Sequence, residues 1–340
     1  MWGHLLRPGI VALSVLALAG CGAETTGPTP PATQVPSTPE LVVGSDTWIN
    51  RADMPGVARW DFATATVKNA AGQSVLYTIG GCTDIRAPRN SVAAYNVATN
   101  TWLGRAPLPG LRCSPNGAGV IDGRIYVTGG IYLQRGTSNL YVYDPATNTW
   151  KEKATIPING GSYGGVTDVL NRRLYVYADC VDIHNCDFAG PGFYRYDPDT
   201  DRWTVLARTQ WSHRYGVGGF IGGKFYLVGG FGVKYIEMYN PATNHWTTVG
   251  SIPRLRQRAA GAVLGGQLYM MGGTEKVNLD SVATIARVNA YDPVTNKWSL
   301  KASLPTPRTG VVGARVSVNG QTRIQVVGGY EPRNNLQYIP

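Results

Sequence analysis

The chain has 340 residues, of which 43 are glycine, and its 31 Lys and Arg against 21 Asp and Glu give a net charge of +10. Glycine at nearly twice its usual share, without a sustained helical periodicity, argues against a helical protein. The positive charge favours anionic partners, although solubility alone would also account for it.

Residues 1–20 have the features of a cleaved leader. Arg7 gives a positive start, and the apolar run "GIVALSVLALAG" has 12 residues, too few to cross a bilayer as a mature helix. The run ends in Leu18-Ala19-Gly20-Cys21, which resembles a bacterial lipoprotein signal. This resemblance implies cleavage before Cys21, acylation of that cysteine and, because Gly22 follows it, the outer membrane of a two-membrane bacterium. An ordinary cleaved secretory signal is the alternative.

The stretch after Cys21, "GAETTGPTPPATQVPSTPELVVGS", contains five Pro and five Thr and almost no charge. Such a composition buries too little apolar surface to order itself. We therefore expect residues 21–45 to form a semi-rigid tether, roughly 70 Å long if extended like polyproline. The remaining residues, 46–340, are expected to form one folded domain.

This domain consists of repeats of about 50 residues. Each repeat has an apolar strand that ends in two small residues; these segments are 75–81, 124–130, 173–179, 224–230, 267–273 and 323–329. After a variable gap comes a strand with a Tyr, a turn of the type Asp-Pro-x-Thr-Asn, and a strand with a Trp. The Tyr precedes the Trp by seven residues in Tyr95 and Trp102, Tyr143 and Trp150, Tyr196 and Trp203, Tyr239 and Trp246, and Tyr291 and Trp298. Period-2 alternation between Gly and Asn/Pro turns predicts a four-stranded antiparallel sheet for each repeat.

A Gly pair, a Tyr and a Trp at set distances resemble the kelch repeat, and the resemblance covers residues 46–340. It implies an all-β fold, a six-bladed kelch-type β-propeller with its blades around a central channel. The last repeat has Tyr338 but no later Trp, whereas Trp48 has no Tyr strand before it. We expect Trp48 to pair with Tyr338, so that the N-terminal strand completes the last blade and closes the ring. The repeat Tyr and Trp residues are then packing residues of the blades.

The ligand site is expected at one mouth of the channel, where each blade's innermost strand starts. Trp60 and Trp211, which the repeat does not require, lie at two of these starts, and arginines gather at most of them. Guanidinium groups pair with carboxylates, and Trp faces stack on sugars or cations. The predicted ligand-binding residues are Arg59, Trp60, Arg112, Trp211, His213, Arg214, Arg258 and Arg308. The alternative is that these arginines only bond one blade to the next.

Four cysteines remain besides Cys21, and an even number in an exported chain favours disulfides. Four cysteines allow three pairings. We favour Cys82 with Cys113, as a clip between neighbouring blades, and Cys180 with Cys186, as the closure of a loop in the third blade. That loop also contains Asp182, His184 and Asp187, but their spacing is not that of a zinc or calcium site, so neither a metal nor a cofactor is expected.

Three functions are compatible with these features. The favoured one is an envelope-anchored binding module for an anionic glycan or an acidic protein segment. The second is a carbohydrate-active enzyme that resembles exported kelch-type sialic acid epimerases (mutarotases), for which the acid/base candidates are Glu331, Glu275, Asp84 and His213. The third is a structural envelope protein. We expect a monomer that contacts the membrane only through the lipid on Cys21 and does not bind nucleic acid.

Overall fold

The computed structural model describes residues 46–84, 87–132, 135–158, 161–179, 191–276, 281–330 and 333–340. These residues belong to one compact unit, Leu41–Pro340. Every regular element within these residues is a β-strand. The described residues contain no helix long and apolar enough to span a membrane. The predicted leader, the tether, Cys21, Cys180 and Cys186 lie outside the described residues.

The described strands form six four-stranded antiparallel sheets, which we number along the chain. The first contains β2 (Ala63–Lys68), β3 (Ser74–Ile79), β4 (Val92–Asn96) and β5 (Thr101–Arg105); the second contains β6 (Ala118–Ile121), β7 (Arg124–Thr128), β10 (Leu140–Asp144) and β11 (Thr149–Lys153). The third contains β12 (Val166–Leu170), β13 (Arg173–Ala178), β14 (Gly192–Asp197) and β15 (Arg202–Val205); the fourth contains β16 (Val217–Ile221), β17 (Lys224–Val228), β18 (Tyr235–Asn240) and β19 (His245–Ser251). The fifth contains β21 (Ala260–Leu264), β22 (Gln267–Met271), β25 (Val288–Asp292) and β26 (Lys297–Lys301); the sixth contains β27 (Val312–Val318), β28 (Gln321–Val327), β29 (Asn335–Ile339) and β1 (Thr47–Arg51).

Two small sheets were not predicted, and most of their strands lie in the variable gaps of the repeat; the exception, residues 256–257, comes just before the innermost strand of the fifth sheet. One pairs β8 (Ile131–Tyr132) with β9 (Arg135–Gly136). The other contains β20 (Arg256–Gln257), β23 (Thr274–Lys276) and β24 (Val282–Thr284). These gaps differ in length and composition from repeat to repeat, so the repeat pattern carries no signal for them.

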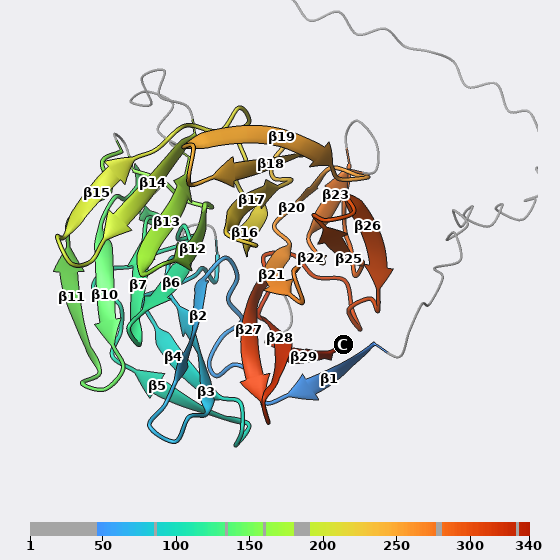
Figure 1. Cartoon of the computed structure of the whole chain (residues 1–340). Helices are drawn as coiled ribbons and strands as arrows, with labels where there is room; N and C mark the ends of the chain where they lie inside the picture. Colours follow the sequence, from blue (N-terminus) through green and yellow to red (C-terminus); the bar gives the residue numbers. More distant parts are fainter. Residues whose placement is uncertain are drawn as a thin grey trace, which may run out of the picture. The chain divides into compact units, whose positions relative to one another are not determined.

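The sixth sheet joins the two ends of the described chain. In Figure 1, β1 lies beside β29 close to the C-terminus, and the two strands pair antiparallel with Trp48 opposite Tyr338. Their rings are 5.0 Å apart, close to the 4.9 to 5.2 Å of the other five Tyr–Trp pairs. The predicted pairing of Trp48 with Tyr338 is therefore present.

Each repeat Trp also ties its sheet to the preceding one. Its indole N–H donates to a backbone carbonyl at or just after the end of the preceding sheet's outermost strand, at 2.7 to 3.1 Å. Trp102 reaches Ala52 after β1 in this way, and Trp48 reaches Ala302 after β26. The repeated spacing of Tyr and Trp thus specifies both the register within a sheet and the contact between sheets.

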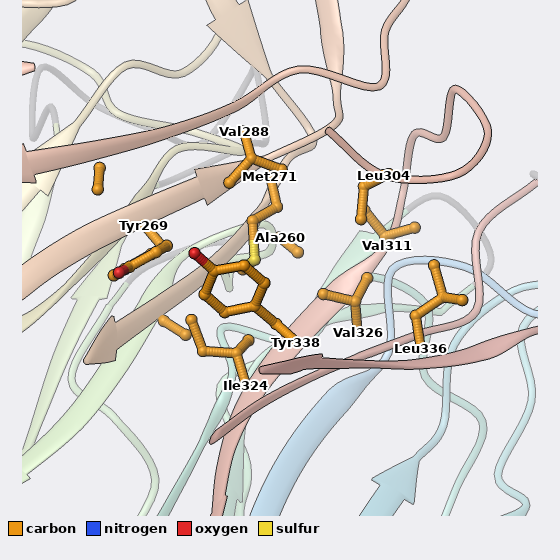
Figure 2. Packing of buried hydrophobic residues seen from close by; sticks show 12 residues of the cluster. Ala260, Tyr269, Met271, Val288, Leu304, Val311, Ile324, Val326, Leu336 and Tyr338 are labelled. Atoms are coloured by element: carbon orange, nitrogen blue, oxygen red, sulfur yellow. The ribbon is translucent and has the colours of Figure 1, made fainter. Parts of the chain in front are cut away.

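The apolar core is divided between neighbouring sheets. Seven clusters of buried residues are found in the described part of the chain; six combine side chains of two adjacent sheets, and a small seventh contains Trp60, Cys82 and Cys113. Figure 2 shows the cluster between the fifth and sixth sheets, where Tyr269 and Met271 of β22 face Ile324 of β28 and Tyr338 of β29. Because every sheet is buried on both faces, the apolar residues of the middle strands form nearly continuous runs.

Candidate binding site around the inner-strand cavity

The innermost strands of the six sheets surround one cavity. They contact one another in the order β2, β6, β12, β16, β21 and β27, and β27 contacts β2. The cavity has a volume of about 710 Å³ and is lined by residues of all six strands. Its ionisable lining residues in the described chain are Asp61, Lys68, Asp168, Tyr215, Arg258 and Arg315.

Three residues lead toward each innermost strand: 59–61, 112–114, 162–164, 213–215, 256–258 and 308–310. The third residue of every triplet has a left-handed backbone, with φ between 47° and 67°. These third residues are joined head to tail, because each backbone N–H donates to the carbonyl of the next at 2.8 to 3.0 Å. In donor-to-acceptor order they are Asp61, Gly310, Arg258, Tyr215, Gly164, Ser114 and again Asp61. We call these six residues the mouth ring.

The first residue of every triplet is buried and serves the packing of the sheets. Arg59 donates to the carbonyls of Gly80 and Ser91, at 2.6 and 3.0 Å. Arg112 donates to Asn139 at 3.1 Å, and Arg308 donates to Thr306 at 3.1 Å. These three predicted ligand residues are thus covered and bonded within the protein, but the acceptors named here for Arg59 and Arg112 flank strands of their own sheets rather than of a neighbouring one. Burial lowers the pKa of Arg59 to about 10, and Arg89 adds to this effect.

His213 takes the first position in the fourth sheet and is fully buried. Its Nδ1 lies 2.7 Å from the carbonyl oxygen of Gly229, and its Nε2 lies 2.9 Å from Oε2 of Glu237. A carbonyl only accepts hydrogen bonds, so Nδ1 carries a proton, and Glu237 also accepts the backbone N–H groups of Gln210 and Trp211. His213 is therefore a structural partner of Glu237 rather than an exposed binding or acid/base group.

The two Trp residues that the repeat does not require have different surroundings. Trp60 is nearly buried and stacks on Tyr330, with ring centroids 4.2 Å apart. It therefore packs beside the mouth ring, next to Asp61. Trp211 is 36% exposed, but it stacks on Tyr235 at the start of β18, away from the cavity lining. Neither indole lines the cavity itself.

The mouth ring presents four side chains to the cavity, and they form a polar network. Asp61 Oδ2 accepts hydrogen bonds from Ser114 Oγ at 3.1 Å and from Arg258 Nη1, with which it also forms an ion pair. The guanidinium of Arg258 lies over the ring of Tyr215, 4.0 Å from its centroid. Burial raises the pKa of the Asp61 carboxyl, although Arg258 and Ser114 oppose the rise. Burial also raises the pKa of Tyr215 to about 12.

Arg214, next to the ring, is the predicted residue with the clearest binding geometry. It is partly exposed, and its guanidinium lies over two aromatic rings, 5.7 Å from the centroid of Tyr163 and 5.8 Å from that of Phe231. Phe231 is itself 60% exposed. No described carboxylate lies within ion-pair distance of Arg214, although its charge lowers the pKa of Asp179 against the larger effect of burial. The buried Nε of Arg214 has no hydrogen-bond partner among the described residues.

The remaining candidates are placed as follows. Cys82 and Cys113 form a disulfide between the first two sheets, with Cα atoms 5.1 Å apart. Glu275 is buried and paired with Arg256 and Arg287, while Glu331 lies outside the described residues. In the described ranges, no group of three or more His, Cys, Asp or Glu side chains is placed to hold a metal ion.

The sequence prediction missed Asp61, Ser114 and Tyr215, and it treated all arginines of the mouth alike. Aligning the six triplets would have separated them, since Arg59, Arg112, Arg256 and Arg308 share the first position whereas Arg258 alone holds the third. The difference of two residues decides whether a guanidinium is buried between sheets or lines the cavity.

Comparison with known proteins agrees with the repeat. The model of the kelch motif matches residues 112–157 and 214–253. Kelch-like protein 15 of Danio rerio is 26% identical over 180 residues, 48% of this chain and 28% of that protein. Kelch-like protein terF of Aspergillus terreus is 26% identical over 242 residues, 67% of this chain and 49% of that protein. The chain thus spans between about a quarter and a half of these curated relatives.

The fold is also similar to a solved structure, that of YjhT. The TM-score is 0.67 at 18% identity, and the match covers 82% of this chain and 92% of that one. Together with the kelch motifs, this likeness confirms the predicted kelch repeat and β-propeller architecture.

Proposed function

We propose that this kelch-repeat β-propeller is a closed, six-bladed binding module whose mouth ring and rim recognise an anionic ligand, either an acidic glycan or an acidic protein segment. The six sheets would be the blades. Two observations support closure: the hydrogen bonds of the mouth ring return to Asp61, and β1 pairs with β29. A ring of blades leaves few strand edges exposed and a central cavity open to a ligand.

The observation that carries the binding proposal is the position of Arg214. A guanidinium that lies over both Tyr163 and Phe231, without a described carboxylate partner, is a preorganised cation beside the mouth ring. Rigid placement lowers the entropy that a ligand must lose on binding. A carboxylate bound by Arg214 would bring the rest of the ligand against the exposed ring of Phe231 and over the cavity.

A positive field around the rim supports the same ligand class. Arg59, Arg112 and Arg308 are buried close to the ring, and none of them forms an ion pair with a described carboxylate. Their charges act over the low-dielectric interior and attract anions to the mouth. The net charge of +10 for the whole chain acts in the same direction.

The test is a screen of acidic glycans and acidic peptides against the purified protein, with Arg214→Ala and the control Arg202→Ala. Arg202 lies exposed on β15, away from the cavity lining. We expect binding to fall at least about tenfold in Arg214→Ala, because a hydrogen-bonded charge contributes about 1.5–3 kcal/mol, and to persist in Arg202→Ala. Equal affinity of both folded variants would overturn the proposal.

The enzymatic alternative, a sugar epimerase similar to the exported kelch-type enzymes, has one observation in its favour. Asp61, whose pKa burial raises, lines the cavity next to the hydroxyl of Ser114 and the network of Tyr215. A carboxyl group of this kind can exchange protons with a bound sugar. Turnover of a bound sugar that is lost in Asp61→Asn would support this function; binding without turnover would exclude it for that sugar.

The proposal includes export and lipidation at Cys21, with residues 21–45 as the tether to the cell envelope. Mass spectrometry of the mature protein tests this part. An acylated N-terminal Cys21 is the expected result, whereas an unmodified mature N-terminus would contradict the anchor and leave the binding proposal unaffected.

A further inference from the structure

The mouth contains two cationic side chains with different electrostatic states. Arg258 is neutralised, because Asp61 forms an ion pair with it and Ser114 holds the same carboxylate oxygen. Arg214 has no such partner among the described residues. Its charge lowers the pKa of Asp179, but the Asp179 carboxylate accepts its hydrogen bonds from Ser212 and Tyr177. Of these two cations, only Arg214 lacks an ion-pair partner within the described part of the chain.

Asp61 is fixed in place more firmly than an exposed carboxylate would be. Its backbone belongs to the mouth ring on both sides, through Gly310 and Ser114. Its side chain accepts hydrogen bonds from two different sheets, the second through Ser114 and the fifth through Arg258. A ligand cannot displace it from Arg258 without also breaking these contacts, so Arg258 stays neutralised.

We propose that Asp61 is a specificity residue, which limits the mouth to glycans that present a single carboxylate to Arg214 and excludes polyanions. This inference rests on the proposed binding function and names its ligand class, a sugar chain that ends in one uronic-acid-type residue. The carboxylate of such a residue is attached to its ring, which suits Arg214 beside the exposed face of Phe231. Further anionic groups of a polyanion would meet Arg258 already neutralised by Asp61, so they would gain no second ion pair there to offset their lost hydration. A segment with many Asp or Glu residues is disfavoured for the same reason.

The test compares two probes, a disaccharide that ends in glucuronic acid and a heparin hexasaccharide, by calorimetry with the purified protein. Asp61→Asn removes the charge and keeps a side chain that tolerates a left-handed backbone. We expect it to raise the affinity for heparin at least about tenfold and to change the affinity for the disaccharide less than about threefold.

Asp168→Asn is the matched control. Asp168 lines the same cavity, and its carboxylate accepts the backbone N–H groups of Phe220 and Val169, so this variant has the same change in net charge away from the mouth. Its affinity for heparin should stay near that of the wild type. Equal gains in both variants would overturn the inference, since net charge alone would then explain them.

A second variant keeps the test informative if Asn at position 61 unfolds the protein. Asp61→Gly puts a glycine at this position of the mouth ring. Two other positions of the ring, Gly164 and Gly310, already hold glycine with the same left-handed backbone. A folded variant of either kind with unchanged heparin affinity contradicts the role of Asp61. If neither probe binds the wild type or any variant, the glycan form of the proposed binding function fails together with this inference; if the wild type binds heparin as tightly as the disaccharide, only the role of Asp61 fails.

Discussion

Removal of the indole of Trp48 tests the closure of the propeller. In the structure this side chain stacks against Tyr338 and donates to the carbonyl of Ala302 at 2.8 Å. The hydrogen bond contributes about 1 kcal/mol and the ring pair about another 1 kcal/mol. With the lost burial of a half-buried ring, we expect Trp48→Ala to lower the free energy of unfolding by about 3 kcal/mol, at the lower end for Trp-to-Ala substitutions.

Trp298→Ala is the matched control within one continuous repeat. Trp298 is also half-buried, lies 5.2 Å from Tyr291 and donates to Ser251 at 3.1 Å. Urea unfolding followed by circular dichroism gives both free energies, and closure predicts that they fall by similar amounts. If Trp298→Ala costs about 3 kcal/mol and Trp48→Ala less than about 0.5 kcal/mol, the N-terminal strand does not complete the last blade.

Three further changes test the energetics of the structure. Cys113→Ser opens a loop with a sequence separation of 31 residues and should lower the free energy of unfolding by about 3–4 kcal/mol; unchanged urea midpoints, with and without reductant, would show that no disulfide forms. Glu237→Gln places an amide N–H₂ among the groups that now donate hydrogen bonds to Glu237, including His213. This change should lower the free energy of unfolding by about 2 kcal/mol, whereas Glu152→Gln at an exposed position should lower it little. Burial raises the pKa of Tyr215 and Tyr239 to about 12, above the value of about 10 in an unfolded chain. The unfolded state therefore loses these protons first, so stability should be fully present below pH 10 and fall as the pH rises from about 10 to 12; a urea midpoint that stays constant over this range would contradict the burial of these hydroxyls.

The fold could be predicted from the sequence because the determining contacts repeat. Five Tyr residues stand opposite their Trp across one short turn, and each repeat Trp indole bonds to the preceding sheet, so the same local geometry recurs and identical spacing reports it. The pairing of Trp48 with Tyr338 follows from the same rule, although 290 residues separate them. A periodic signal survives the divergence of the surrounding sequence.

The binding site could be predicted only to the level of the mouth, because the direction of its side chains depends on tertiary contacts. The sequence shows that Arg256 and Arg258 lie near the start of one innermost strand. It does not show that the first is buried with Glu275 and the second lies over Tyr215, since this depends on the left-handed backbone at the third position. That conformation is stabilised by hydrogen bonds between sheets, which a local sequence pattern does not encode.

The backbone conformation of the mouth ring separates the positions where only the backbone matters from those where the side chain has a role of its own. A left-handed φ costs a non-glycine residue about 1 kcal/mol or more, and Gly164 and Gly310 show that glycine satisfies this position. Asp61, Ser114, Tyr215 and Arg258 nevertheless adopt it, with φ of 48°, 47°, 60° and 53°. Packing does not require them, because the ring is held through backbone atoms that glycine also supplies. Their side chains form one network on the cavity wall, and strained positions that persist in a fold concentrate at functional sites. If the mouth binds a ligand as proposed, the four non-glycine positions of the ring are therefore the ones expected to set its specificity, whereas glycine is sufficient for the structure of the ring.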